Sequence, residues 1–385
     1  MKILYHHRTA SRDGQSTHIL EMIGALRALG HEVVEVAPAI GEAASDGGGS
    51  PGWVGSLKAL LPRGLYELAE LCYSLLAYRR LCTAVREYQP HAIYERYNLF
   101  LLAGIWTKQR FGLPLILEVN APMALERARY GGLSWPRLAR WSERWVWRRA
   151  DAVLPVTSVL AHHLLAEGVA PERIQVIPNG INDAHYRNLP DTESAKAALG
   201  LTGRLVVGFT GFVREWDRLD RIVEWMAEAL SQHSLHLLVV GDGPARAEIE
   251  SVAQRLGISD RVSFTGVIPR ERVPAHAMAF DIALQTALVP YASPLCLFEY
   301  LRLGKAIVAP DQPNHRELLL ADVNAVLYPP DEPGGIEKAL DRLCNEPLLR
   351  EKVALGAAIL IDERNLRWQD HAGTVIGRFR ALGVA

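Results

Sequence analysis

The sequence has 385 residues, more than one ordinary hydrophobic core accommodates, and fits two domains of typical size. Its 49% hydrophobic and 22% charged residues are typical of a globular protein and exclude a disordered or fibrous one. A formal net charge of -1 argues against nucleic acid as a partner, because proteins that bind a phosphate backbone normally carry a strong basic excess. This charge says nothing against a small anionic ligand.

The four cysteines are far apart and form no CxxC pair, so we expect neither a zinc site nor a disulfide framework. The N-terminal KILYHH lacks the charged and long apolar regions of a signal peptide. No uncharged run approaches the roughly 20 residues that a membrane span needs. A reducing cytoplasm is therefore the expected compartment, and peripheral contact with the inner membrane face stays open.

The chain begins with the βαβ pattern of a doubly wound sheet. Lys2 to Tyr5 is a predicted strand, the loop HHRTASRDGQSTH leads into a helix that ends at Gly30, and the strand HEVVEVAP follows. Such folds bind ligands at the first loop. The dinucleotide fingerprint GxGxxG is absent, so Gly14 and Gln15 are the residues expected to bring backbone close to a ligand.

Residues 41–52 are a predicted flexible loop, because GEAASDGGGSPG is rich in glycine and serine. Residues 53–81 follow, with apolar residues at helical spacing and basic residues between them. A helix of this kind either presents a surface to lipid or acceptor or, more often, packs its apolar stripe into the core.

Two further predicted strands end in polar residues. HAIYERY ends at Glu95 and Arg96, and PLILEVNAP contains Glu118 and Asn120. Active-site groups of an open sheet lie at the carboxyl ends of its strands. Glu118 therefore either orients a substrate or caps its strand. ADAVLPVT and IQVIPNGI complete this half.

From about residue 183 the α/β pattern restarts. Predicted strands are RLVVGFTG, HLLVVGDGP, RVSFTGVIP, DIALQ and AIVAP. Two successive halves of similar length predict two Rossmann-like domains, residues 1–182 and 183–365, with a binding site in the cleft between them.

The segment SPLCLFEYLRLG predicts a helix of about ten residues, with Ser293 as N-cap, Pro294 in the first turn and Gly304 as the C-terminal stop. The backbone N–H groups of Leu295 and Cys296 would then hold an anion such as a diphosphate. Glu299 lies roughly 7 Å along the helix from Pro294, which suits a ribose diol. The alternative is an ordinary amphipathic helix with a solvated glutamate.

The ordered set PNGI, VVGFTGFVRE, GDGPARAEIE, RVSFTGVIPRERV and SPLCLFEYLRLGKAIVAPD resembles glycosyltransferase family 4 over nearly the whole chain. The resemblance implies the α/β GT-B fold, with residues 366–385 and the helix that starts at Trp368 returning to the first domain. It also implies a retaining reaction that uses a nucleoside diphosphate sugar and needs neither a metal nor a cofactor.

The resemblance assigns roles to individual residues. Glu299 corresponds to the second glutamate of an E-x7-E motif and is expected to bind the donor ribose, whereas the first position holds Tyr291. The arginine and lysine that neutralise the diphosphate in relatives correspond to Phe212 and Trp216, which leaves Arg214 and Arg218 as the nearby cations. Asn120 replaces a histidine and cannot act as a base. The residues predicted to bind the donor are Gly14, Gln15, Gly211, Arg214, Arg218, Gly241, Val267, Ile268, Pro269, Ser293, Pro294, Leu295, Cys296 and Glu299, and the predicted catalytic residues are Glu118, Asn120 and Arg214.

These expectations describe a transferase that moves a sugar from UDP, in preference to GDP, to a glycan, a lipid-linked sugar or a small metabolite. A nucleotide-sugar epimerase or hydrolase of the same fold is one alternative, and a non-catalytic nucleotide-sugar binding protein is another. The latter is suggested by the tyrosine and tryptophan at the glutamate and lysine positions.

Overall fold

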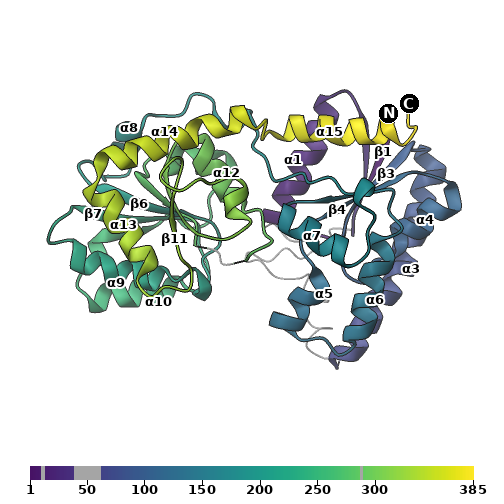
Figure 1. Ribbon diagram of the computed structural model, residues 1–385, viewed down its shortest axis with the longest axis horizontal. Coiled ribbons are helices and arrows are strands. Elements are labelled where there is room, and N and C mark those ends of the chain that lie inside the picture. The colour runs from purple at the N-terminus through teal and green to yellow at the C-terminus, as the bar shows by residue number, and fades with distance from the viewer. Residues whose placement is uncertain (10–13, 39–61, 287–288) are drawn as a thin grey trace. The chain divides into compact units, whose positions relative to one another are not determined.

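The computed structural model describes residues 1–9, 14–38, 62–286 and 289–385, which form two compact units, each built around a parallel sheet (Figure 1). Unit 1 comprises Met1–Asn179, Tyr291–Ser293 and Trp368–Ala385, and unit 2 comprises Gly180–Pro290 and Pro294–Arg367. The chain thus changes unit close to the expected positions 182 and 366. The segment Tyr291–Ser293 belongs to unit 1, although the sequence placed it inside the second domain.

The sheet of unit 1 has five parallel strands in the order β2-β1-β3-β4-β5. Leu4 on β1 lies opposite Val34 on β2 and Ile93 on β3. Strands β1, β3, β4 and β5 are almost wholly buried, which explains their apolar runs, whereas the edge strand β2 is partly exposed. Their bounds are β1 Lys2–His6, β2 Glu32–Val36, β3 Ala92–Arg96, β4 Leu115–Val119 and β5 Ala152–Pro155.

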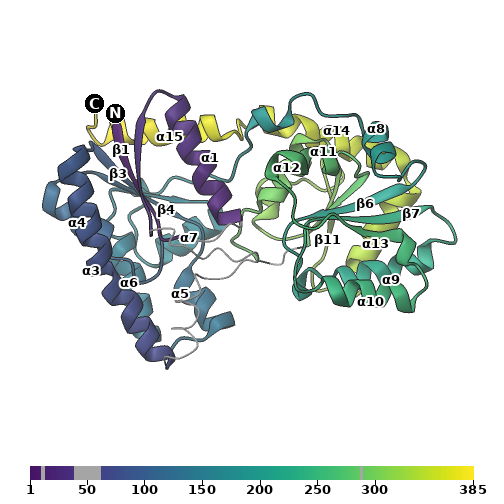
Figure 2. The same cartoon turned by 180° about the vertical axis from the view of Figure 1, so that it is seen from behind.

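Helices cover this sheet, and α15, which follows the last chain crossing, packs against α1 (Figures 1 and 2). The predicted return of the C-terminal helix to the first domain is confirmed. The helices of unit 1 are α1 Gly14–Ala28, α3 Arg63–Tyr88, α4 Ala103–Phe111, α5 Met123–Glu126, α6 Pro136–Trp147, α7 Ser158–Ala166 and α15 Trp368–Ala381, with short helical turns at Arg127–Gly131 and Pro171–Arg173.

One segment of unit 1 departs from regular structure, and two other predicted segments lie wholly or partly outside the described residues. The segment IQVIPNGI, which completes this half, forms no regular strand: it makes an isolated bridge at Ile174 and backbone hydrogen bonds from Gln175 and Ile177 to β5. Proline lacks the backbone N–H that pairing between strands requires, and glycine weakens a strand, so the pairing with β5 does not continue. The predicted loop 41–52 and the first part of the segment 53–81 lie outside the described residues.

The sheet of unit 2 has six parallel strands in the order β11-β10-β9-β6-β7-β8. The edge strand β11 was not predicted, because VLY is too short to show a pattern. The bounds are β6 Leu205–Thr210, β7 Leu235–Val240, β8 Val262–Phe264, β9 Ile282–Leu284, β10 Ala306–Pro310 and β11 Val326–Tyr328.

The helices of unit 2 alternate with these strands along the chain. They are α8 Thr192–Ala198, α9 Leu219–Ala229, α10 Arg246–Arg255, α11 Val273–Ala277, α12 Leu295–Arg302, α13 Gly335–Asn345 and α14 Pro347–Glu363, with short turns at Asp183–Tyr186, Glu215–Asp217, Ser259–Arg261, Arg270–Arg272 and His315–Glu317.

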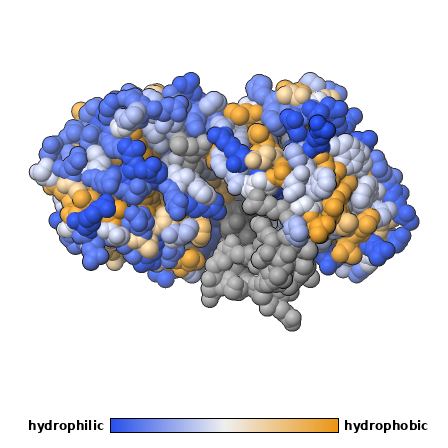
Figure 3. All heavy atoms as spheres, turned by 90° about the horizontal axis from the view of Figure 1, so that it is seen from below, coloured by the Kyte–Doolittle hydropathy of each residue, from blue (hydrophilic) through white to orange (hydrophobic). Residues whose placement is uncertain are grey.

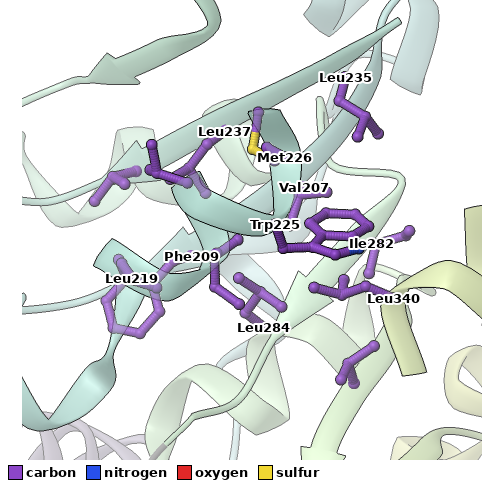
Figure 4. Packing of buried hydrophobic residues seen from close by; sticks show 14 of the residues in the cluster. Val207, Phe209, Leu219, Trp225, Met226, Leu235, Leu237, Ile282, Leu284 and Leu340 are labelled. Carbon is purple, nitrogen blue, oxygen red and sulfur yellow. The ribbon is translucent and has the colours of Figure 1, made fainter. Parts of the chain in front are cut away.

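A large apolar cluster fixes one face of this sheet, where Trp225 and Met226 of α9 pack over Val207, Leu237 and Ile282 (Figure 4). Full burial of a Leu, Ile or Met side chain contributes about 1.5–3 kcal/mol. The cluster therefore holds strands β6, β7 and β9 in place, and with them the loops at their carboxyl ends.

Candidate active site

Helix α12 is tied to the carboxyl end of β6 by a buried hydrogen bond in which the backbone N–H of Thr210 donates to Tyr300 Oη, at 2.7 Å. The helix ends as predicted, because Gly304 adopts a left-handed conformation with φ of +59°. Its start differs from the prediction.

The prediction of Ser293 as N-cap is wrong. The helix begins at Leu295 after an extended Pro294, which has ψ of 127° and provides no side-chain cap. Ser293 belongs to unit 1, where its Oγ accepts a hydrogen bond from the backbone N–H of Asn179 at 3.2 Å. A role for Ser293 in donor binding stays a prediction.

The first turn of α12 carries Leu295 and Cys296, the residues predicted to offer backbone N–H groups to an anion. The Cys296 thiol donates to Gln285 Oε1 at 3.1 Å. Burial, followed by the charges of Glu299 and Asp217, raises the pKa of Cys296 to about 12, so the thiol is neutral at ordinary pH. Cys296 is therefore a hydrogen-bond donor and not a nucleophile.

Glu299 lies one turn further along α12, partly exposed, and its charge contributes to the raised pKa values of both Cys296 and Tyr300. Its carboxylate is thus close to the first turn of the helix, as the spacing predicted. Side chains on a helix lean toward its N-terminus, which brings this carboxylate nearer to the backbone N–H groups of that turn.

The loop after β6 is held by Asp217. One carboxylate oxygen accepts from the backbone N–H of Arg214 at 2.8 Å. The other accepts from Oγ1 of Thr286, two residues after β9, at 3.2 Å. Burial raises the pKa of Asp217. Neither Asp217 nor Thr286 was singled out from the sequence, because they are 69 residues apart.

The two candidate cations on this loop differ in their surroundings. The Arg214 guanidinium lies 5.3 Å from the centre of the Phe212 ring and 5.1 Å from that of Trp216, and both rings are at least half exposed. Arg218 is paired with Asp220, at 3.3 Å. Phe212 and Trp216, which occupy the positions of the family's arginine and lysine, therefore both lie close to the Arg214 guanidinium.

Gly211 and Gly241 allow two loops to approach each other. A Cβ on Gly241 would lie 2.0 Å from the carbonyl oxygen of Gly211, and both residues have positive φ. The GDGP turn predicted to bind the donor thus packs directly against the loop that carries Arg214. The structure shows this packing role for Gly241, and its contact with a donor stays a prediction.

The loop Val267–Pro269 follows β8, and Val267 is 87% exposed. Beside it lies a cavity of about 380 Å³ whose lining includes Phe264, Thr265, Ile268, Arg272 and His276. The loop is thus accessible from solvent, and the predicted contact of its residues with a donor stays a prediction.

At the carboxyl edge of the sheet in unit 1, Glu118 is buried among several partners. Tyr94 Oη donates to it at 2.8 Å and Asn120 Nδ2 at 2.6 Å, the Arg96 guanidinium is paired with it, and His18 Nε2 lies 3.0 Å away. Burial alone would raise the pKa of Glu118, but His18 and Arg96 outweigh it and hold the pKa well below its usual range. Glu118 is therefore an ionised carboxylate that positions Asn120 and His18.

His18 extends this network to the chain crossings. Its Nδ1 lies 2.7 Å from Asn179 Oδ1, and its ring is 4.6 Å from that of Trp368. Asn179 also contacts Ser293, and its carbonyl oxygen is 3.3 Å from His371 Nε2. Sequence reasoning did not single out Asn179, because it is 161 residues from His18.

Tyr291, at the position of the family's first glutamate, belongs to unit 1. Its ring packs on the apolar cluster of that unit, and its carbonyl oxygen accepts from Thr157 Oγ1 at 3.0 Å. Burial, with the nearby Glu126, raises the pKa of Tyr291 to about 12. Tyr291 is therefore a neutral group.

Gly14 and Gln15 lie at the start of α1, the first helix after β1. The residues just before them are outside the described ranges, so their contact with a ligand stays a prediction. Among the described residues, no group of three or more His, Cys, Asp or Glu is arranged to hold a metal ion, and no helix is long and apolar enough to cross a membrane.

Two Rossmann-like units with parallel sheets and a C-terminal helix that returns to the first unit define the GT-B class of glycosyltransferases. Residues 13–180 match the Glycosyl transferase 4-like domain, and residues 191–358 match Glycosyl transferases group 1. The chain belongs to the glycosyltransferases of the family 4 type.

Its sequence is 25% identical over 258 residues to an alpha-D-kanosaminyltransferase of Streptomyces kanamyceticus, covering 65% of this chain and 66% of the relative. It is 34% identical over 153 residues to a 2-deoxystreptamine glucosyltransferase of the same organism, covering 38% of this chain and 39% of the relative. The chain thus matches less than two thirds of the length of either.

The fold is similar to that of Anabaena HepE, solved in complex with UDP, with a TM-score of 0.76, 18% identity, and coverage of 99% of this chain and 100% of HepE.

Proposed function

We propose that the protein transfers a sugar from a UDP-sugar to a small polyhydroxylated acceptor, with retention at the anomeric carbon. The observation that carries this proposal is the placement of Glu299 next to the first turn of α12, on a helix that Tyr300 fixes to the end of β6. In this proposal the diphosphate accepts hydrogen bonds from the backbone N–H groups of that turn, and the ribose hydroxyls donate to the Glu299 carboxylate.

The preference for UDP is supported by the similarity in fold to HepE, which was crystallised in complex with UDP. The diphosphate needs countercharge, because negative charge develops on the leaving group as the sugar departs. Arg214 supplies it in this proposal, since its guanidinium is exposed between two rings whereas Arg218 is paired with Asp220.

The acceptor class is suggested by the name of one relative, which acts on 2-deoxystreptamine, a ring that carries hydroxyl and amino groups. In unit 1, Asn120 is a partly exposed amide whose orientation is set by Glu118. An amide both donates and accepts hydrogen bonds, so it suits a sugar-like hydroxyl. Glycan and lipid-linked acceptors are the other outcomes of an acceptor screen.

Retention is expected without a protein base. Asn120 cannot take a proton, and Glu118 is buried and strongly held in its ionised form. In a reaction on one face of the sugar, the departing phosphate accepts the proton of the attacking hydroxyl. An epimerase or hydrolase would need an acid and a base in the site, and analysis of the products with and without acceptor separates these activities.

The test of the proposal is Glu299→Gln, which keeps the shape but removes the charge. Loss of the charge and of one of the two acceptor oxygens should weaken donor binding by about 1–3 kcal/mol. The ribose does not change charge during transfer, so KM for the donor should rise more than kcat falls.

A 2′-deoxyribose donor provides the matched control. The wild type should lose affinity for the deoxy donor, and Glu299→Gln should lose much less. Equal losses in the two proteins would show that Glu299 does not contact the ribose. If no nucleoside diphosphate raises the melting temperature at millimolar concentration, the assignment of unit 2 as the donor domain is wrong.

A further inference from the structure

The segment 128–149 of unit 1 is strongly basic. It contains six arginines and one acidic residue, Glu143, whereas the whole chain has a formal net charge of -1. Glu143 is only 4% exposed, and burial raises its pKa to about 7. The single acid of the segment is therefore buried and is not part of its exposed surface.

Helix α6 directs most of this charge outward. Its buried residues include Ala139, Ser142, Glu143, Val146 and Trp147, which recur at helical spacing on one side. The opposite side consists of Arg137, Arg140, Trp141, Arg144 and Arg148, all exposed, and we call this set the basic face of α6.

Aromatic side chains accompany these arginines. Trp141 is 50% exposed in the middle of the basic face, and its ring centre lies 6.3 Å from that of Trp145. The Arg149 guanidinium lies 4.5 Å from the centre of the Trp145 ring. Before the helix, Tyr130 is 68% and Trp135 49% exposed.

The start of α6 is fixed to α3. The buried Glu67 carboxylate accepts from the backbone N–H groups of Ser134 at 2.6 Å and Trp135 at 2.9 Å, and Trp135 Nε1 donates to the carbonyl oxygen of Gly64 at 3.2 Å. The basic face is therefore presented on a helix held from its first turn, and little order has to be gained when it binds.

Among the described residues, one carboxylate is paired with the basic face. Glu167 of the α7 terminus pairs with Arg144 and its carbonyl oxygen accepts from Arg148 at 2.8 Å. Within the described part of the chain, no carboxylate is paired with Arg137 or Arg140. Most of the positive charge on the face is thus available to a partner.

We propose that the basic face of α6 binds the surface of a lipid bilayer that contains anionic lipids. Arginines on one side of a helix meet lipid phosphates, and tryptophan prefers the headgroup region, where its ring is partly apolar and its N–H is hydrated. The neighbouring Leu125 and Leu65 are each 53% exposed. Figure 3 shows hydrophobic residues among hydrophilic ones on the surface of unit 1, at the right.

Other occupants fit less well. A second copy of the chain would bring two basic faces together, which repel each other. A nucleic-acid strand would suit the arginines and the aromatic rings but leaves the exposed leucines without a role. This proposal goes beyond the proposed transferase reaction and does not depend on it.

The experiment is flotation of the whole protein with vesicles of phosphatidylcholine alone and of phosphatidylcholine with 30% phosphatidylglycerol. Wild type should float with the anionic vesicles only, and high salt should release it. The double variant Arg137→Gln and Arg140→Gln should bind about thirtyfold more weakly, since each basic residue near the surface is worth about fivefold. Arg255→Gln with Arg364→Gln, an equal charge change at exposed arginines of unit 2, is the control.

A second measurement reports on Trp141. Brominated lipids should quench the tryptophan fluorescence of the wild type more than that of Trp141→Phe. Equal binding to neutral and anionic vesicles, an equal loss in the control variant, or binding to a single-stranded RNA oligonucleotide without binding to vesicles would each overturn the proposal.

Discussion

Tyr300 Oη accepts a hydrogen bond from the backbone N–H of Thr210 at 2.7 Å, which links the middle of α12 to the last residue of β6. Tyr300 is fully buried. The position of Glu299, the next residue back along the helix, therefore depends on this one hydrogen bond as well as on packing.

Tyr300→Phe should lower the free energy of unfolding by about 1–3 kcal/mol, because a buried N–H is left without its acceptor. UDP affinity should fall as well, since α12 is less firmly held. Urea unfolding and UDP titration measure the two effects. Tyr328→Phe, at a buried tyrosine of the same unit, is the control and should change stability by less than about 0.5 kcal/mol.

Glu143→Gln should stabilise the protein at alkaline pH. Burial raises the pKa of Glu143 from 4.5 to about 7 in the folded state, so the wild type loses stability as pH rises through this window. The glutamine stays neutral and still accepts from Tyr97 Oη. The variant should match the wild type near pH 5 and exceed it above pH 8 by up to about 3 kcal/mol.

Melting curves across this pH range measure the Glu143 effect. Glu172→Gln, at an exposed acid of the same unit, should change stability by less than about 0.5 kcal/mol at either pH. A difference between Glu143→Gln and wild type that does not vary with pH would contradict the raised pKa.

Gly241→Ala should destabilise unit 2, because the new Cβ would meet the Gly211 carbonyl oxygen and φ is +149°. Backbone strain of this kind costs about 1–3 kcal/mol, and the displaced loop carries Arg214. Gly24→Ala, in the middle of α1 with open space around it, should instead stabilise by about 1 kcal/mol. Urea unfolding of the two variants compares a required glycine with a dispensable one.

Arg214→Gln should weaken UDP binding about ten- to a hundredfold, because a charge-assisted hydrogen bond to phosphate contributes roughly 1.5–3 kcal/mol. The salt dependence of binding should flatten at the same time. Arg218→Gln is the matched control, since Arg218 pairs with Asp220, and should have a small effect. A larger loss for Arg218→Gln would reverse the assignment, and titrations at two salt concentrations decide it.

Local patterns in the sequence predicted most of the regular structure. Buried parallel strands have continuous apolar runs, so β1, β4, β6, β7 and β10 are readable one at a time. Gly304 marks the end of α12 because a left-handed residue is needed there and glycine adopts it without strain. The order of the motifs also identified the family.

Tertiary structure alone decided how the candidate site is held together. Asp217 anchors the Arg214 loop through Thr286, and Glu118 takes its partners from β3, α1 and its own strand end. The segment Tyr291–Ser293 joins unit 1 although both its neighbours belong to unit 2. Each of these depends on contacts between residues far apart in the chain, for which no local spacing or propensity exists, and the low pKa of Glu118 follows only once His18 and Arg96 are brought beside it.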